Sequence, residues 1–568
     1  MKMLKRIAPK NGIRLAVFAA ALGMLATGCQ TYQQQNHVIA FYRAGNLTNA
    51  VVEAKKIVQK NLDDKDSVIW LLEEGAVLRA NGQYDDSNKA FDLAEEKIDK
   101  FSEAAKIRLG QETGALLSNQ ANLDYEGRYY DGIMVDTYRA LNYLELGDFD
   151  KARPAIIRAY QRQQDAVEDN KKRIEKTQAA AAKDKNNAAI TKAQNNPKLQ
   201  GAMQSNYSNL DSLKPYADYV NPFTVYLDGL YFMANAADAS DLERAHKSFE
   251  RVSDFLGDND YIKQDLAAVD DVMNGKPLQP TTYVIFETGC APVRDQFRID
   301  LPIIAPGLGV ASFNAAFPTL KFQDNCVPSL TVSAGTNTLN TALLSSMDSV
   351  IGLDFKNELP VVVTKTLASS ITKTVLTQAS AQAAGQAGGD FAKLFVQLGG
   401  AIYNASVNIA DERTWTTLPK EFQFCRFPTP ADRKLDISTA DGLQRQTVTL
   451  NSGDINLVYV KSIGLTTPLI ISQFKLNSST MLTPPAPAPA PVVNVAPPAE
   501  VAAPTVAAAT PAAQTESAPA TNAPAPAESA NVAAVNTNAI VVDAVAAVEP
   551  TVGTAETNAP ATAPEAVK

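Results

Sequence analysis

The stretch that decides the fold of the first half of the chain is WLLEEGAVLRANGQYDDSNKAFDLAEEKI, Trp70–Ile98. Large and small apolar residues recur in it at helical spacing, and a glycine divides it into two arms. The landmarks of this pattern are Leu71, Gly75, Gly82, Tyr84, Phe91 and Ala94. Small residues allow two helices to approach closely, and large residues fill the gap to the next pair. We therefore predict two packed helices joined by a turn at Gly82.

These landmarks stand at the spacings of a tetratricopeptide repeat, although Ser87 occupies a position where that repeat prefers alanine. The pattern recurs with lower fidelity around Gly45, around Gly147 and in the stretch 241–252. Repeats bury their apolar faces only against neighbouring repeats. We therefore expect an all-α solenoid of this kind over residues 29–279, with a generic helical bundle as the alternative.

A charged insertion at residues 161–200 interrupts the repeats. It is rich in Lys, Gln, Ala and Asn and almost lacks large apolar residues. We predict a long solvated helix followed by a mobile loop. A basic helix that binds membranes is the alternative, which we disfavour because the segment has no apolar face.

Residues 280–478 change character and predict a mixed α/β (α+β) domain. The stretch opens with two strand-like runs around a Gly-Cys-Ala-Pro turn and closes with four more such runs. Between them we predict two helices, the first with Pro360 in its first turn and the second over 391–402. The uncharged stretch Leu301–Leu320 contains three prolines, which exclude a membrane-spanning helix there. A sheet packed against two helices is the expected architecture.

The remaining residues, 479–568, form an Ala/Pro-rich tail. Ala, Pro, Thr and Val dominate its composition, and the aromatic residues that a core would use are missing. We expect this tail to be disordered. It is either a tether or an inert extension.

The start of the chain predicts a secretory signal. Basic residues precede a short apolar run, Leu15–Ala26, which is too short to span a bilayer. Small residues then lead to Cys29, and this arrangement resembles the lipobox of bacterial lipoproteins. The resemblance implies that residues 1–28 are cleaved as a signal peptide and that Cys29 carries acyl chains such as palmitate. It also implies, because Gln30 follows, an address at the outer membrane on its periplasmic face. An ordinary signal with a chance cysteine is the alternative.

Composition excludes several classes of function. The net charge is −9 and the isoelectric point about 5.1, so a nucleic-acid partner is not expected. Only two histidines occur, which leaves little material for a metal site or a Ser–His triad. We expect no metal and no cofactor.

Cysteine usage allows one disulfide. Once Cys29 is assigned to lipid, three cysteines remain, and Cys290 with Cys326 is the favoured pair in an oxidising compartment. Such a loop would be stabilised by about 3–4 kcal/mol. The alternative is three buried, reduced cysteines.

Three stretches of the second half resemble a largely uncharacterised family of bacterial outer-membrane lipoproteins with helical repeats at the N-terminus. They are 283–302, 354–373 and ADERTWTTLP at 410–419, the last resembling an Ala-Asp-x-Arg-x-Trp-x-x-Leu-Pro signature. Glu358 and Lys365 depart from the family's pattern. The resemblance implies a fold and an address, but it implies no reaction and no catalytic residues.

Two groups of side chains invite a functional interpretation. Asp411, Arg413 and Trp415 could bind a ligand through a guanidinium fork and an indole face, but we favour a rigid corner between helix and strand. Glu287 and Cys290 suggest a base and a nucleophile, but a cysteine at a strand end is more often structural.

The sequence therefore predicts a lipid-anchored scaffold that binds an unknown protein or peptide in the solenoid groove, with a role in envelope assembly or maintenance and no enzymatic activity. The alternative is a hydrolase of envelope glycan or peptide using acids of residues 280–478. These acids are Glu287, Asp354, Glu358, Asp411 and Glu412. Two of them about 5–9 Å apart at the floor of a pocket would favour the hydrolase, whereas an open groove would favour binding. A purely structural tether is the third possibility.

Overall fold

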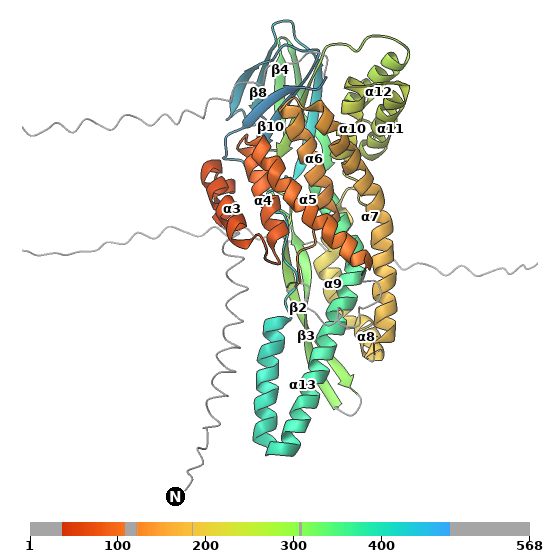
Figure 1. Ribbon diagram of the computed structural model, residues 1–568, viewed down its shortest axis with the longest axis vertical. Helices are drawn as coiled ribbons and strands as arrows, with labels where there is room; N and C mark the ends of the chain where they lie inside the picture. The colour runs from red at the N-terminus through yellow and green to blue at the C-terminus, as the bar shows by residue number, and fades with distance from the viewer. Residues whose placement is uncertain (1–36, 108–120, 122, 185, 306–308, 478–568) are drawn as a thin grey trace, which may run out of the picture. The chain divides into compact units, whose positions relative to one another are not determined.

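The computed structural model describes residues 37–107, 121, 123–184, 186–305 and 309–477 (Figure 1). The chain divides into two compact units, Met1–Ala488 and Pro489–Lys568, and every described element belongs to the first. The predicted signal peptide, Cys29 and the predicted tail 479–568 lie outside the described residues.

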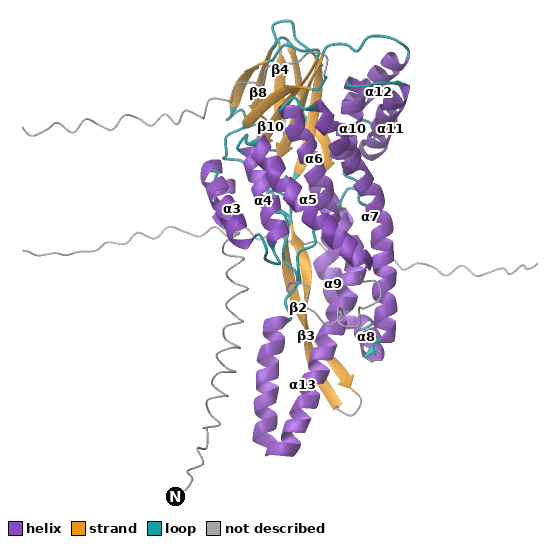
Figure 2. Ribbon diagram, viewed as in Figure 1, coloured by secondary structure: helices purple, strands orange, loops and turns teal. Residues whose placement is uncertain are grey.

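The first half of this unit is helical, as predicted (Figure 2). A helical segment at 37–43 precedes the helices α3 (Leu47–Asn61), α4 (Ser67–Ala80), α5 (Tyr84–Ile107), α6 (Tyr129–Glu145), α7 (Phe149–Lys183), α8 (Asn187–Gln194), α9 (Pro197–Tyr207), α10 (Pro222–Ala234), α11 (Ala239–Leu256) and α12 (Asp260–Met273). A short 3-10 helix, η3 (Ser208–Ser212), follows α9. Consecutive helices pack against each other from α3 to α7 and again from α10 to α12.

Glycines set the turns and the close contacts between these helices. Gly45, Gly82 and Gly147 all adopt positive φ, at 72°, 76° and 74°, which glycine tolerates at turns without strain. Inside the array, Gly75 of α4 faces the ring of Phe91 so closely that no Cβ would fit. The sequence pattern predicted both the turn at Gly82 and this contact between a small and a large residue.

The second half is a mixed α/β structure, also as predicted. Its elements are β1 (Thr281–Thr288), β2 (Val293–Ala305), β3 (Gly309–Lys321), β4 (Leu330–Ala334), β5 (Asn337–Asn340), β6 (Ala342–Ser346), α13 (Met347–Val407), β7 (Glu421–Pro428), β8 (Lys434–Thr439), β9 (Arg445–Thr449), β10 (Ile455–Ser462) and β11 (Ile470–Lys475). They form a five-stranded sheet in the order β11-β10-β1-β7-β6, a β2-β3 pair and a four-stranded sheet in the order β5-β4-β8-β9.

Strand β1 lies at the centre of the five-stranded sheet, and both of its faces are covered. It pairs in parallel with β10 and antiparallel with β7. Tyr283 and Ile285 join the core shared with the helices, whereas Val284 and Phe286 join the core shared with the four-stranded sheet. A strand buried on both faces carries apolar residues at consecutive positions, as in the central YVIF of TTYVIFET.

Helix α13 differs from its prediction. Instead of two helices, with Pro360 in the first turn of the first, one helix runs from Met347 to Val407 with Pro360 inside it. A proline inside a helix costs about 3 kcal/mol. Packing offsets this cost, because Met347, Ile351 and Phe355 are buried at four-residue spacing in the main core before the proline is reached. Figure 1 shows that α13 doubles back at its far end, and the predicted second helix lies in this returning part.

The insertion at 161–200 also differs from its prediction. The long helix is present as α7, but the expected loop is replaced by α8 and α9. Several side chains of the insertion are buried, so it is only partly exposed to solvent. Ile190 and Leu199 are buried in a separate apolar cluster with Leu367 of α13 and Phe313 of β3. Alanines surround these few large residues and allow close packing, so a segment with little apolar bulk still folds against its neighbours.

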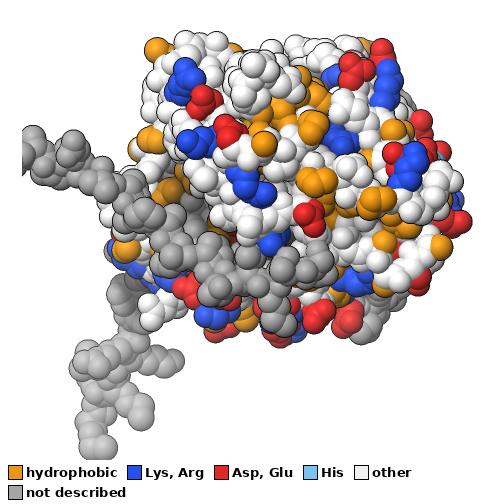
Figure 3. Space-filling model, turned by 90° about the horizontal axis from the view of Figure 1, so that it is seen from above, with side chains coloured by type: hydrophobic (Ala, Val, Ile, Leu, Met, Phe, Trp, Pro, Cys, Tyr) orange, Lys and Arg blue, Asp and Glu red, His pale blue; other side chains and the backbone are white. Residues whose placement is uncertain are grey.

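The two halves share their largest apolar core. Leu72 and Tyr138 from the helices pack in one cluster with Trp415 and Phe422 from the α/β half. The predicted division between residues 279 and 280 therefore falls inside one compact unit. Seen from above, the surface shows basic and acidic side chains interspersed with small apolar patches (Figure 3).

Candidate functional site

Residues 410–418, which make up all but the last residue of the signature, lie against one face of the helical array. We call this face the inner face. Trp415 is fully buried, and its ring packs 5.7 Å from Phe91 of α5 and 5.9 Å from Tyr138 of α6, measured between ring centroids. Its indole Nε1 donates a hydrogen bond to the hydroxyl of Thr417 at 2.9 Å. The indole therefore fills the junction between helices and sheet.

Glu73 of α4 binds the backbone of this segment. Its carboxylate accepts hydrogen bonds from the backbone N–H groups of Thr416 (2.7 Å) and Thr417 (3.2 Å), and from both threonine hydroxyls. The hydroxyl of Tyr42 donates to the carbonyl oxygen of Thr417 at 3.2 Å. Burial raises the pKa of Glu73 in spite of the four donors. Side chains of the helices thus bind the backbone of residues 416–417, which is how a helical array would bind an extended peptide.

A chain of ion pairs fixes the start of the same segment. Arg413 contacts Asp411 and Asp66, each at 2.8 Å, and donates to the carbonyl oxygen of Leu123. Asp411 also contacts Arg128 at 3.2 Å. Asp411 and Arg413 are both paired within the chain, which is the arrangement expected of the rigid corner.

Glu358 of α13 is the centre of a buried cationic cluster. Arg128, Arg173 and Arg294 all contact its carboxylate, the last at 2.6 Å. Burial acts to raise the pKa of Glu358, but the three guanidinium groups outweigh it and hold that pKa well below its usual range. Glu358 is therefore a permanent anion that ties α13 to α6, α7 and β2.

Asp354, one helical turn earlier on α13, is the opposite case. It is 4% exposed, and burial together with the charge of Glu358 raises its pKa to about 7. Two carboxyl groups with separated pKa values are a pattern found in acid–base catalysis. Here, however, Glu358 is covered by arginines.

Glu287 and Cys290 have separate partners. Glu287 is buried and accepts hydrogen bonds from the hydroxyls of Tyr138 and Tyr459, and it pairs with Lys461. Burial acts to raise the pKa of Glu287, but Lys461 outweighs it and the pKa is lowered. The Sγ of Cys290 points to the carbonyl oxygen of Ile463, and burial raises the pKa of this thiol. A thiol of raised pKa is a poor nucleophile.

The predicted disulfide is not formed in the structure, where Cys290, Cys326 and Cys425 are free thiols. Cys326 does approach the segment that precedes Cys290, because its Cβ lies 2.6 Å from the position that a Cβ on Gly289 would take. The side chain of Cys290 is instead directed into the core beside Ile463. The structure therefore shows Cys290 and Cys326 on neighbouring segments without a bond between them.

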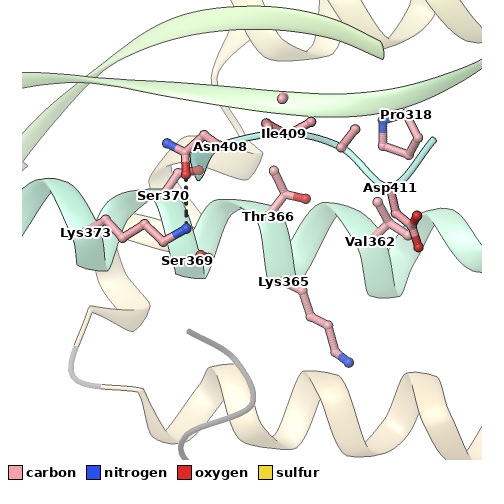
Figure 4. A pocket seen from close by; sticks show the side chains of 12 residues that line it. Pro318, Val362, Lys365, Thr366, Ser369, Ser370, Lys373, Asn408, Ile409 and Asp411 are labelled. Carbon is pink, nitrogen blue, oxygen red and sulfur yellow. Dashed lines mark hydrogen bonds between the residues drawn. The ribbon is translucent and has the colours of Figure 1, made fainter. Parts of the chain in front are cut away.

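One small pocket adjoins residues 408–411 (Figure 4). It lies between α13, β3 and residues 408–411, and Lys373 donates to the side-chain oxygen of Asn408 across it at 3.2 Å. Its volume of about 30 Å³ accommodates a water molecule but no sugar ring or peptide. Asp411 is the one acid among its lining residues, so this pocket does not hold the pair of carboxylates that a hydrolase requires.

A larger cavity, of about 550 Å³, opens between α7, α8, α9 and α13. Its lining consists of Gln178, Ala181, Ala182, Asn187, Ile190, Thr191, Gln194, Met203, Lys356, Leu359, Pro360, Val363 and Thr364. The volume is in the range of small-ligand sites. Its buried members are mostly aliphatic, its exposed members are neutral or basic, and it contains no carboxylate. This lining is suited to binding an aliphatic group.

Comparison with known proteins finds no match: the chain matches no family model, no curated protein and no solved structure. Among the described residues, no set of His, Cys, Asp and Glu side chains could hold a metal ion.

Sequence reasoning did not find Glu73, Arg128 or Arg294. Glu73 offered one signal, because it stands in an otherwise apolar helical stretch, WLLEE, where an acid at a buried position demands partners. Arg128 and Arg294 offered no such signal, because their partner Glu358 is distant in the sequence.

Proposed function

We propose that this chain belongs to the lipoprotein family that it resembles. Lipid on Cys29 anchors it to the outer membrane on the periplasmic face, and it acts there as a protein-binding scaffold in envelope assembly or maintenance. The anchor is supported by the basic, apolar and small-residue pattern before Cys29. No helix within the described residues has both the length and the apolar character needed to cross a bilayer.

The observation that carries the scaffold proposal is the packing of the helical array. Gly229 of α10 faces Phe249 of α11 in the same way as Gly75 faces Phe91, because a Cβ added to Gly229 would lie only 2.7 Å from the ring. Recurrence of one glycine–phenylalanine contact in two helix pairs supports tetratricopeptide-like units. Stacked units of this kind present extended surfaces to protein partners.

The partner site we propose is not the inner face beside Glu73, because residues 410–418 already cover it. The array instead exposes large apolar side chains on other faces. Val52 of α3 is 57% exposed and Leu93 of α5 is 42% exposed. We place the partner's contact on these two helices, where apolar side chains would contribute to binding.

The catalytic alternative receives less support from the geometry. Glu287, Glu358 and Asp411 all pair with cations of the same chain, and neither described pocket brings two of the predicted acids together.

Two measurements in cells test the proposal. Mass spectrometry of the mature N-terminus should find an acylated Cys29, and Cys29→Ala should allow a high-salt wash to release the protein from the membrane fraction, whereas the parent chain should resist that wash. A mature chain beginning at another, unmodified residue would refute the anchor.

For the scaffold, a photo-crosslinking residue at Val52 or Leu93 should capture one or a few partners reproducibly. The same residue at Leu465, which is 49% exposed in the loop between β10 and β11, is the control. Identical capture at all three positions would contradict a partner site on α3 and α5.

A further inference from the structure

One region of the molecule is almost free of charge. The sequence has no charged side chain from Leu301 to Leu320, and between residues 374 and 407 it has only Asp390 and Lys393. The first stretch contributes the paired ends of β2 and β3, and the second is the far part of α13 (Figure 1). Helix α13 packs along β3, where Leu367 and Ile371 share an apolar cluster with Phe313, so the uncharged part of α13 begins directly after this contact. On this part of α13, Leu376 is 67% exposed.

Basic helices flank these uncharged elements. Both α8 and α9 pack against β2, and α7 and α8 pack against α13. From residue 171 to residue 200 the only acids are Glu175 and Asp184. The exposed lysines of this segment are Lys171, Lys172, Lys183, Lys192 and Lys198. A local excess of positive charge on a chain of net charge −9 indicates attraction to an anionic surface.

The 550 Å³ cavity opens among the same helices. Its buried lining includes Ile190 of α8 and Val363 of α13, and Lys356 stands among its exposed members. Lys356 pairs with Asp211 at 3.1 Å, so the cavity offers an aliphatic interior suited to an acyl chain, and the exposed lysines of α7, α8 and α9 are the cations for a headgroup.

From these three observations together we propose that this region binds the surface of an anionic phospholipid bilayer. We call it the docking region: α7 from Lys171, α8, α9, the uncharged ends of β2 and β3, and α13 from residue 374. The basic segment has no apolar face of its own, but β2, β3 and α13, against which its helices pack, add the surface that is almost free of charge. Its lysines would contact headgroup phosphates, and its elements that are poor in charge can approach the acyl boundary because Asp390 and Lys393 are the only charged residues that they contribute. This contact needs no covalent lipid, so it is independent of the proposed anchor at Cys29.

Vesicle binding tests the proposal on the chain without its signal segment and with Cys29→Ala, so that no covalent lipid is present. The probes are phosphatidylcholine vesicles with and without phosphatidylglycerol. The chain should sediment with the anionic vesicles, and added salt should weaken binding. Failure to bind anionic vesicles, or equal binding to neutral ones, would overturn the proposal.

A matched pair of triple variants locates the contact. Lys171→Gln, Lys183→Gln and Lys192→Gln together should weaken binding about a hundredfold, from about fivefold per lysine near an anionic surface. The control changes Lys247, Lys263 and Lys276 to Gln, because these lysines are equally exposed on or beside α11 and α12. The control should stay within about twofold of the parent chain, because its three lysines would not lie near the anionic surface. Equal losses in both variants would place the contact elsewhere.

A fluorescent reporter tests the uncharged part. Leu376→Trp should be quenched by brominated lipid in anionic vesicles, whereas Leu443→Trp, at an 84% exposed turn between β8 and β9, should not. The native Trp70 and Trp415 are buried and give a constant background. Absence of quenching at residue 376, or equal quenching at both positions, would contradict approach of α13 to the acyl boundary.

Discussion

Replacing Glu73 of α4 with alanine should destabilise the protein strongly, although it leaves the apolar core intact. The carboxylate of Glu73 satisfies two backbone N–H groups and two hydroxyls of Thr416 and Thr417. In Glu73→Ala the hydroxyls can rotate toward other acceptors, but the two N–H groups remain buried without a partner. Each such donor costs about 1–3 kcal/mol.

The burial of a charge offsets part of this loss. Burial raises the pKa of Glu73, which shows that the charged carboxylate is itself penalised in the native state. We therefore expect Glu73→Ala to lower the free energy of unfolding by about 3 kcal/mol, in the lower half of the range of about 2–6 kcal/mol that two unsatisfied donors would cost. Glu73→Gln keeps one acceptor oxygen and should lose about 1–2 kcal/mol.

Urea unfolding followed by tryptophan fluorescence measures this effect, because Trp415 lies between the helices and the segment that Glu73 binds. The control is Glu74→Ala, the next residue of the same helix, which is partly exposed. Its loss should stay below about 1 kcal/mol. If Glu73→Ala and Glu74→Ala unfold at the same urea concentration, the carboxylate does not hold the segment in place.

Three further outcomes are expected. The pKa of Asp354 is raised to about 7 by burial and by Glu358, so the native state binds its proton more tightly than the unfolded state and stability falls as pH rises from about 4 to about 7. Asp354→Asn should flatten this fall in urea midpoints measured across that range, and an unchanged slope would contradict the assignment. Gly75→Ala should cost about 1–3 kcal/mol because its methyl group meets the ring of Phe91, whereas Gly201→Ala, with open space around it, should be neutral or slightly stabilising by thermal unfolding. Burial raises the pKa of the Cys425 thiol well above its usual range, so a thiol reagent at neutral pH should leave it unmodified until urea is added, and rapid labelling of native protein would show that it is not buried.

Local chemistry explains what the sequence predicted well. A glycine at a helix turn and a small residue opposite a large one act within about forty residues, and so spacing alone predicts the roles of Gly82, Gly75 and Phe91. The strands around β1 were equally visible, because a strand covered on both faces is continuously apolar.

Long-range pairing explains what was missed. Nothing in the sequence near Glu73 indicates that its partners are Thr416 and Thr417, and nothing near Arg128 indicates Glu358. A local rule favours Pro360 as the start of a helix, whereas burial of residues earlier in α13 decides the true start at Met347. The acids proposed for catalysis could be identified as acids, but their arginine and lysine partners depend on the tertiary structure.

The segment at 410–418 has a consequence for the folding of this protein during synthesis. Helices α4 to α6 are made hundreds of residues before the tryptophan that fills the space between them. During synthesis these helices therefore lack the side chain that fills the space between them, and cooperative folding has to wait until the chain has passed residue 418. A fragment that ends before Trp415 should be caught by chaperones or degraded, and the helical half should be recoverable when the missing strand-rich half is supplied as a separate polypeptide.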